Sequence, residues 1–506
     1  MFEDKPKPGK VILVGAGPGD AGLMTIKGLQ ALRQAEVVVY DRLVGGGILE
    51  QIPEQAEKIY VGKNVGHHVV PQERINEILL EKALEGKRVV RLKGGDGFVF
   101  GRGGEELEGL GVHGIPFEVV PGITSAIAAP AYAGIPVTHR ELSASLHIIT
   151  GHLKDGAELK LDYDALVRLG GTLIFMMSVS SLPEIAAGLI QAGMSQEMPC
   201  AVVENGTLSR QRKLVGTLSM IDQAVKENKV KSPAVFVVGH VCQLSERFDW
   251  FSALPLLGKR ILVTRPKATA SKLSERLRAL GAEVVLAPTI RTRSVSFEMP
   301  DLSPYTVLIF TSAAGVSSFF DAMDRVELDA RVLYGKRIAA VGNETAAALK
   351  ACGLKADFVP SVFCGETLAE EMLASGWVGT ADRVLIAGAA VMAQALPDLL
   401  SAAEIELKCL VVYETEALPC QAMELEAFDW VTFTSASCVE GFVRCVNDAP
   451  ERLKGVKALC IGAQTAAEAS KYPMDIVVAK EATIDAMVER ICEETVKENE
   501  HPTKEA

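Results

Sequence analysis

The sequence of 506 residues has no cysteine before position 200 and no Cys-x-x-Cys pair among the ten cysteines that follow. We therefore expect reduced thiols in a cytoplasmic protein, and neither a disulfide framework nor a zinc site. Long apolar runs and an apolar leader are also missing, so we expect no membrane span and no export. A basic excess is absent too, because the formal charge is −12, which argues against nucleic acid as a partner.

What the chain does have is enough apolar sequence for several cores. Hydrophobic residues make up 48% of it, and its length suggests about three or four domains. Short apolar runs alternate with stretches of helical spacing, beginning with the run at residues 10–15. This alternation predicts an α/β fold.

The most informative stretch is the glycine-rich segment at residues 91–106, where glycines are interleaved with Arg91, Lys93 and Arg102. A strand that ends in Gly-Gly-Asp brings bare backbone to the carboxyl edge of a sheet, where open α/β sheets hold ligands. Asp96 would accept hydrogen bonds from a ribose or an amine, and the cations would meet carboxylates. The alternative is an ordinary glycine-rich surface loop.

A second glycine cluster, at residues 15–20, has features of a dinucleotide-binding loop, and the acidic Asp41 follows about twenty residues later. Two features disagree with that interpretation. The third glycine is out of register, and Pro18 removes an amide that a phosphate would need. An NAD(P)-dependent oxidoreductase stays open as an alternative. Farther on, the adjacent His67 and His68 have no third ligand at zinc spacing, so we predict no metal site.

These segments occur together in an order that resembles the tetrapyrrole methylases, and specifically uroporphyrinogen-III C-methyltransferase. The resemblance rests on motifs at residues 15–25, 40–43, 91–106 and 121–124 and covers about residues 8–250. It implies two α/β subdomains, at about 8–130 and 138–250, with S-adenosylmethionine bound in the cleft between them. It also implies a tetrapyrrole substrate and a homodimer formed through this half.

The resemblance assigns roles to individual residues. Asp41 and Lys63 match the proton acceptor and donor, which suits a reaction in which a pyrrole carbon attacks the methyl group and leaves an iminium-like ring that must lose a proton. Without the resemblance, the better interpretation of Asp41 is a turn residue at a strand end. The cofactor contacts that the resemblance implies are Pro18, Gly94, Gly95, Asp96, Val99, Thr124, Ser125, Met177 and Gly206.

Basic residues near these motifs are candidates for binding the carboxylates of a uroporphyrinogen. The main candidates are Arg91, Lys93, Arg102 and Arg140, with Lys63 and His67 as further ones. Alternatively, they are solvated surface charges, which contribute little to the stability of the fold. Three positions depart from the family pattern and bear on the shape of the pocket: Gly97 replaces a proline, residues 45–47 are all glycine, and Ser178 follows Met177.

The alternating pattern breaks after residue 250 and a new apolar run begins near residue 259, so we place the main domain boundary there, with 251–257 as a linker. The second half contains an internal repeat, in which residues 311–319 resemble 434–442 and residues 342–345 resemble 462–465. Two similar α/β units are therefore expected. In each unit an apolar run leads into Thr-Ser at a predicted helix start. These hydroxyl residues, which either bind a ligand or merely cap the helix, are Thr311, Ser312, Thr434 and Ser435.

This half resembles uroporphyrinogen-III synthase over about residues 258–494, through an ordered set of individually loose motifs. The resemblance implies two flavodoxin-like domains with the active site between them and no cofactor. The first would hold about residues 258–293 plus 415–494 and the second about 296–412, with 495–506 as a tail. Tyr413 and Thr465 match residues implicated in that family, and the four hydroxyls would bind acetate and propionate groups. A buried strand aromatic is the competing interpretation of Tyr413.

The two resemblances concern consecutive steps of one pathway. We therefore expect a bifunctional enzyme that makes uroporphyrinogen III from hydroxymethylbilane and methylates it twice, at C2 and C7, to precorrin-2, toward siroheme or cobalamin. The alternatives are the oxidoreductase named above and a tetrapyrrole sensor without turnover.

Overall fold

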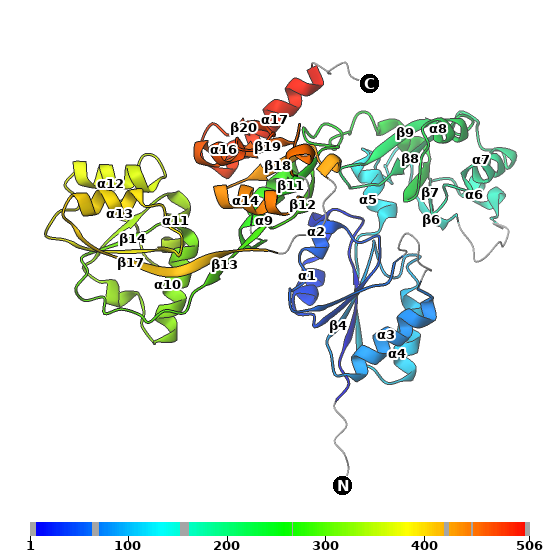
Figure 1. The fold of residues 1–506 in the computed structure, drawn as a ribbon. Helices are drawn as coiled ribbons and strands as arrows, with labels where there is room; N and C mark the ends of the chain where they lie inside the picture. The colour runs from blue at the N-terminus through cyan, green and yellow to red at the C-terminus, as the bar shows by residue number, and fades with distance from the viewer. Residues whose placement is uncertain are drawn as a thin grey trace, which may run out of the picture. The chain divides into compact units, whose positions relative to one another are not determined.

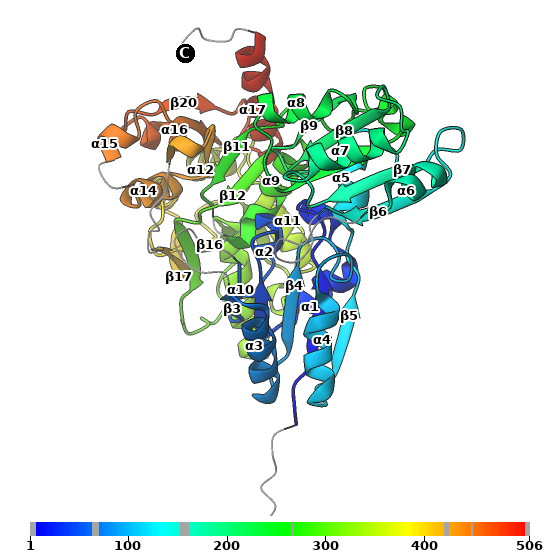
Figure 2. The ribbon, with the colours of Figure 1, turned by 90° about the vertical axis from the view of Figure 1, so that its right-hand side faces the viewer.

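The computed structural model describes residues 7–62, 70–151, 161–265, 267–418, 425–446 and 449–500. Lys63, His67 and His68, singled out above, lie outside these residues. The chain divides into two compact units, one of Met1–Ile261, Ser274–Val285 and Cys492–Ala506, the other of Leu262–Leu273 and Leu286–Ile491. Within the described residues, four five-stranded sheets with helices between their strands confirm the predicted α/β class (Figures 1 and 2). In the described part of the chain, no helix has the length and apolar character to span a membrane.

The first sheet is parallel throughout, with the order β3-β2-β4-β1-β5. Its strands are β1 (Val11–Gly15), β2 (Val37–Tyr40), β3 (Glu57–Tyr60), β4 (Val89–Lys93) and β5 (Phe117–Val120). Its helices are α1 (Ile26–Arg33), α2 (Gly46–Leu49), α3 (Gln72–Leu84) and α4 (Gly103–Val112). Helices α1 and α2 bury one face of the sheet, and α3 and α4 bury the other (Figure 1). Because both faces are covered, β1 and β2 are apolar runs rather than alternating patterns, whereas β4 carries Arg91 and Lys93 toward its carboxyl end.

The second sheet is mixed, with the order β6-β7-β10-β8-β9 and antiparallel pairing from β7 onward. Its strands are β6 (Leu146–Thr150), β7 (Thr172–Met176), β8 (Pro199–Glu204), β9 (Arg212–Thr217) and β10 (Ala234–Val238). Its helices are α5 (Ser125–Tyr132), α6 (Tyr163–Leu169), α7 (Leu182–Gln191) and α8 (Ile221–Glu227). Helix α5 packs on one face and α6, α7 and α8 pack on the other (Figure 1). Helix α5 therefore follows the first sheet in the chain and helps to form the core of the second.

Two further sheets are built from the second half of the sequence, with the orders β12-β11-β18-β19-β20 and β13-β17-β16-β14-β15. The strands of the third sheet are β11 (Arg260–Val263), β12 (Glu283–Leu286), β18 (Trp430–Phe433), β19 (Lys457–Cys460) and β20 (Asp475–Val478). Those of the fourth are β13 (Ile290–Ser294), β14 (Val307–Phe310), β15 (Arg337–Ala340), β16 (Arg383–Ala389) and β17 (Glu406–Ala417). The third sheet has the flavodoxin-like order 2-1-3-4-5.

The internal repeat predicted from the sequence occupies equivalent places in these two sheets. The repeat copies begin at β14 and β18, each followed by a helix, a parallel neighbouring strand and a second helix. In the third sheet these strands come after β11 and β12 in the chain, whereas in the fourth they come before β16 and β17. The helices of this half are α9 (Lys267–Ala279), α10 (Ala313–Arg325), α11 (Asn343–Ala351), α12 (Gly365–Ala374), α13 (Ala395–Ala402), α14 (Ala436–Arg444), α15 (Ala449–Arg452), α16 (Ala463–Ala469) and α17 (Ile484–Glu500).

The cysteines give one correction. Cys445 is disulfide-bonded, so the expectation of reduced thiols is wrong at that position. Spacing along the chain does not reveal such a bond, because it depends on the distance between the two Cα atoms in the fold. The structure describes eight other cysteines, all outside any disulfide.

Candidate functional site

Three loops meet at the carboxyl edge of the first sheet with their backbones in direct contact. Gly17 and Gly95 pair with each other, with N···O distances of 3.1 and 2.6 Å. A Cβ atom on Gly122 would lie 2.3 Å from the carbonyl oxygen of Gly95, a distance that no side chain permits. Gly95 also has a φ of +70°, which glycine adopts at little cost. The two glycine clusters of the sequence and the motif at residues 121–124 therefore form one backbone platform at the edge where ligands bind in open α/β sheets.

Asp96 fixes the geometry of this platform. Its Oδ1 accepts hydrogen bonds from the backbone N–H groups of Phe98 and Val99, at 2.8 and 3.2 Å. Its Oδ2 accepts another from the N–H of Gly122, at 2.9 Å. A carboxylate that receives three backbone N–H groups holds two loops in register.

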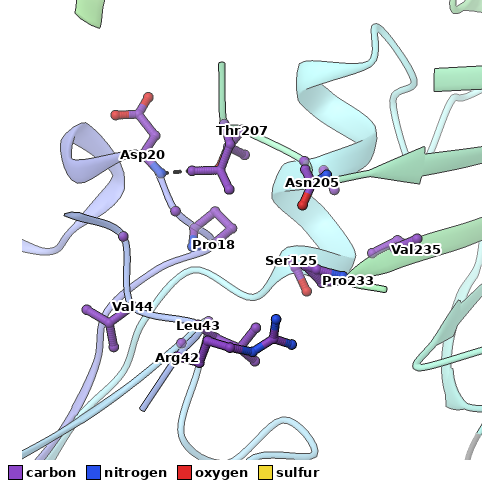
Figure 3. A pocket seen from close by; sticks show the side chains of 18 of the residues that line it. Pro18, Asp20, Arg42, Leu43, Val44, Ser125, Asn205, Thr207, Pro233 and Val235 are labelled. Carbon is purple, nitrogen blue, oxygen red and sulfur yellow. Dashed lines mark hydrogen bonds between the residues drawn. The ribbon is translucent and has the colours of Figure 1, made fainter. Parts of the chain in front are cut away.

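A cavity of about 840 Å³ opens above the platform, and loops from both the first and the second sheet line it. Figure 3 shows Pro18 and Asp20 from the loop after β1, with Asn205 and Thr207 from the loop after β8. All nine predicted cofactor contacts line this cavity: Pro18, Gly94, Gly95, Asp96, Val99, Thr124, Ser125, Met177 and Gly206. Asp41, Lys93 and Arg102 line it as well. The structure thus gathers these residues in one wall, and what each of them binds stays a prediction.

Strained backbone is concentrated around this cavity. Among the described residues, eight non-glycine residues have positive φ, and five of those eight line the cavity. They are Phe100, Arg102, Met177, Asn205 and Thr207. Such conformations cost about 1–3 kcal/mol each and persist only where the surroundings impose them. For Thr207, a β-branched residue, the φ of +70° is an outlier.

Asp41 lies at the end of β2 and has two partners. Its Oδ1 accepts a hydrogen bond from the N–H of Leu43 at 3.0 Å, so the turn expected at this strand end is present. Its Oδ2 lies 3.5 Å from Nη2 of Arg91, and the Asp41 side chain is 25% exposed to solvent. A turn residue that also carries an oriented, partly exposed carboxylate is available for proton transfer.

Behind this wall lies a buried ionic cluster centred on Glu106, whose side chain is 1% exposed. Its Oε1 accepts hydrogen bonds from Lys93 Nζ at 2.7 Å, Gln72 Nε2 at 3.1 Å and Arg91 Nε at 3.2 Å. Its Oε2 has no hydrogen-bond partner among the described residues. Burial, and then the charge of Arg91, lowers the pKa of Lys93, while Glu106 and Asp41 oppose that shift. Glu106 therefore helps to keep a buried ammonium charged at the cavity wall.

The four basic residues predicted to bind substrate lie in different surroundings. Lys93 and Arg102 line the cavity, and Arg102 pairs with Glu105 at 2.6 Å on the exposed start of α4. Arg91 is 3% exposed and uses its guanidinium inside the cluster. Arg140 is exposed and is not among the residues that line the cavity. The structure brings only two of the four to the cavity surface.

In the second half, the predicted hydroxyl residues lie at the carboxyl ends of β14 and β18. Ser312 and Ser435 are the N-caps of α10 and α14, and their Oγ atoms accept hydrogen bonds from Gly315 N and Cys438 N. Capping, the simpler of the two interpretations, is therefore present at both positions. Ser312 Oγ also donates to the hydroxyl of Tyr413 at 3.0 Å.

Tyr413 packs against the core of the fourth sheet, as the interpretation of a strand aromatic expects, and its hydroxyl accepts the hydrogen bond from Ser312. Thr311 Oγ1 donates to the carbonyl of Ala387 at 3.4 Å, which places a third hydroxyl at the same edge. Thr434 precedes Ser435 at the matching edge of the third sheet, and Thr465 is 4% exposed in the first turn of α16. Ligand binding by these residues stays a prediction.

Several residues of the cavity wall were not predicted. They include Leu43, Gln72, Phe100, Asn205 and Thr207. Leu43, Phe100, Asn205 and Thr207 lie beside predicted residues, so inspection of the flanking positions would have found them. Gln72 lies on α3, which no motif marks, so the sequence carried no signal for it.

Models of two protein families match the chain. The model for tetrapyrrole (corrin/porphyrin) methylases matches residues 10–222, and the model for uroporphyrinogen-III synthase HemD matches residues 271–489. A porphyrin biosynthesis protein HemD from Ruminiclostridium josui is 48% identical over 497 residues, which are 96% of this chain and 98% of that protein. This relative is similar across both halves at once.

Other relatives match one half. A siroheme synthase from Enterobacter sp. (strain 638) is 53% identical over 244 residues, 48% of this chain, and the match spans 52% of that protein's length. A solved structure of uroporphyrin-III C-methyl transferase from Thermus thermophilus, complexed with S-adenyl homocysteine, is 40% identical. It covers 47% of this chain and 100% of its own, with a TM-score of 0.40.

Proposed function

Because the chain belongs to the family of porphyrin-biosynthesis proteins that join a tetrapyrrole methylase to a uroporphyrinogen-III synthase, we propose that it performs two consecutive reactions. The synthase half cyclises hydroxymethylbilane to uroporphyrinogen III. The methylase half transfers methyl groups to C2 and C7 of that product and yields precorrin-2, toward siroheme or cobalamin.

One observation carries the methylase assignment: the nine predicted cofactor contacts and Asp41 line a single cavity. These residues come from segments as far apart as Pro18 and Gly206, so their meeting in one wall is a property of the fold and not of the sequence order. The glycine platform below them lets a ligand approach the backbone closely.

The cavity also fits S-adenosylmethionine chemically, and when bound this cofactor supplies the methyl group. A sulfonium is positively charged, so it needs carbonyl oxygens and a carboxylate rather than the amide cradle that suits a phosphate. The residues that would hold it are Gly94, Gly95, Asp96, Thr124 and Gly206, all at the cavity wall. Pro18, which has no amide hydrogen, is compatible with this ligand and unfavourable for a dinucleotide.

The chain's own contribution to the chemistry is proton transfer and orientation. Methylation makes the attacked ring carbon quaternary and leaves the ring as an iminium-like cation; Asp41 takes up the proton that this ring system then loses from another position, and Arg91, 3.5 Å away, holds the carboxylate in place. Lys93 and Arg102 at the cavity wall bind substrate carboxylates. In the synthase half, Tyr413 and the hydroxyls near it hold a flexible linear substrate in one reactive geometry.

A product assay tests both reactions. The purified protein is given hydroxymethylbilane without oxygen, with and without S-adenosylmethionine, and the products are identified by mass spectrometry. We expect uroporphyrinogen III without the cofactor and its dimethylated product with it. An Asp41→Asn variant should keep the first product and lose the second, by about 10²- to 10⁴-fold in rate.

Other outcomes point to the alternatives. Methylation of added uroporphyrinogen III without any cyclisation would overturn the synthase assignment and leave the methylase one. No turnover of either substrate would favour a sensor. Binding of NAD(P) in place of S-adenosylmethionine would favour the oxidoreductase.

A further inference from the structure

Four residues close a ring of hydrogen bonds beside the methylase cavity, and we call it the 20–132–207–211 ring. Asp20 N donates to Thr207 Oγ1 at 3.2 Å, and Thr207 N donates to Gln211 Oε1 at 2.7 Å. Gln211 Nε2 donates to the carbonyl of Tyr132 at 2.9 Å, and the Tyr132 hydroxyl donates to Asp20 Oδ2 at 2.7 Å. The ring joins the loop after β1, the end of α5 and the loop between β8 and β9. Figure 3 shows its Asp20–Thr207 link at the cavity.

The ring holds a segment that is strained. Asn205 and Thr207 have φ values of +50° and +70°, and Gly206 lies between them against α5, where a Cβ would come within 2.4 Å of the Ala129 Cβ. Thr207 is 4% exposed and uses both its N–H and its hydroxyl inside the ring. Because such a conformation persists only when its surroundings impose it, the ring is the physical restraint on the 205–207 loop.

Two members of the ring touch the cavity and two do not. Asp20 and Thr207 line it, whereas Tyr132 and Gln211 are not among the lining residues. Tyr132 is further fixed by edge-on and tilted packing against Trp250 and Phe251, with ring centroids 4.9 and 4.8 Å away. Burial, and then the hydrogen bond to Asp20, raises the pKa of Tyr132, so its hydroxyl stays protonated and continues to donate at neutral pH.

We infer that Tyr132 and Gln211 are positioning residues for the cofactor pocket, because they hold the 205–207 loop against the loop after β1. This inference rests on the proposed methylase function. Neither residue lines the cavity. Each acts through Thr207 or Asp20, which form part of the wall.

The test uses the full-length protein and S-adenosylhomocysteine as the probe, with its dissociation constant measured by calorimetry. The variants are Tyr132→Phe, Gln211→Ala and the double variant. Each single variant should weaken binding by about 10-fold, because Tyr132→Phe removes one charge-assisted hydrogen bond and Gln211→Ala removes two neutral ones. The double variant should be no weaker than the singles, because one broken link already opens the ring. The KM for S-adenosylmethionine should rise, while the KM for uroporphyrinogen III stays the same.

Tyr163→Phe is the matched control. Its hydroxyl is buried and has no hydrogen-bond partner among the described residues, so its loss should leave the dissociation constant unchanged. A Tyr132→Phe protein that melts at a lower temperature but binds the probe normally would overturn the inference and leave the proposed function standing. Fully additive effects of Tyr132→Phe and Gln211→Ala would also overturn it. If Tyr132→Phe fails to fold, Gln211→Ala carries the same expectation. A wild-type protein that does not bind the probe would overturn the proposed function and this inference together.

Discussion

The two halves of the chain build their candidate sites by different physical means. The methylase cavity depends on glycine contacts, on five residues with positive φ and on a buried ionic cluster. The hydroxyl sites of the synthase half use ordinary helix starts, and Ser312 and Ser435 have extended backbones with φ near −164° and −163°. Close backbone contacts and buried charges set the shape of the first site, so we expect a change of a single atom there to reduce activity strongly. The second site consists of side chains on unstrained backbone, so we expect substitutions there to reduce activity by smaller amounts.

The largest effect should come from adding one methyl group to the glycine platform. In Gly122→Ala the new Cβ would lie 2.3 Å from Gly95 O and 2.6 Å from Gly15 Cα, so two loops must move apart. A displacement of this size costs about 100-fold in rate at a site that orients its reactants. We expect methyl transfer to fall by about that factor while the cyclisation rate is unchanged, as measured in the product assay.

Gly104→Ala serves as the control for this change. Nothing lies within 4 Å of a Cβ at that exposed position of α4, so the protein should gain about 1 kcal/mol of helix stability at most and keep its activity. Equal losses in the two alanine variants would contradict the steric account of the platform.

The next effect concerns the buried ionic cluster. Glu106→Gln leaves Lys93 and Arg91 without their shared carboxylate, and breaking a buried pair in this way costs about 3 kcal/mol in the free energy of unfolding. Burial and Arg91 already lower the pKa of Lys93, and loss of the Glu106 charge lowers it further. At pH values between this lowered pKa and the ordinary lysine pKa, the unfolded chain binds more protons than the folded protein. The free energy of unfolding therefore rises with pH in that range. Because the pKa of Lys93 is lower still in Glu106→Gln, this rise in the free energy of unfolding begins at a lower pH in the variant than in the wild type.

The difference between wild type and Glu106→Gln should therefore shrink as the pH is raised from 7 toward about 10. Urea unfolding at several pH values measures this. Glu108→Gln, at an exposed position of the same helix, should show no pH-dependent difference. A difference in the free energy of unfolding that stays constant over the whole pH range would mean that Lys93 does not cause the pH dependence.

The smallest effect should appear in the synthase half. Tyr413→Phe removes the hydroxyl that accepts from Ser312 but keeps the aromatic ring in the core. One neutral hydrogen bond contributes about 1 kcal/mol, so cyclisation should slow by at most about 10-fold with methyl transfer unchanged. Tyr334→Phe, at a side chain that is 94% exposed, should have no effect. An unchanged cyclisation rate in Tyr413→Phe would reduce Tyr413 to a packing residue.

Local patterns made much of the fold predictable. The repeat at residues 311–319 and 434–442 placed two strand-to-helix junctions, and Ser312 and Ser435 cap helices there. The glycine motifs marked the platform because close backbone contacts such as Gly122 to Gly95 admit no other residue. The permuted order of the strands in the fourth sheet was not predictable, because strand pairing leaves no trace in either repeat copy.

The charged and polar partners in the candidate site were also hidden from the sequence. Glu105 and Glu106 are neighbours, yet one is exposed and pairs with Arg102 while the other is buried with Lys93. Which of the two points inward depends on the rotational phase of α4, which the glycine-rich start of that helix leaves undefined. The bond from Tyr132 to Asp20 spans 112 positions, and a single sequence contains no signal for such a contact.

Helix α5 shows how one short element limits the way this chain can diverge. Ser125, Ala129 and Tyr132 are spaced by four and three residues, so they lie on one face toward the cavity, Gly206 and Asp20 respectively. Inserting or deleting one residue would turn the rest of the helix by about 100° and remove at least one of these contacts. Ile127 and Ala131 are more exposed and free to vary. Related chains can therefore change the composition of this helix on its outer side, but not its length.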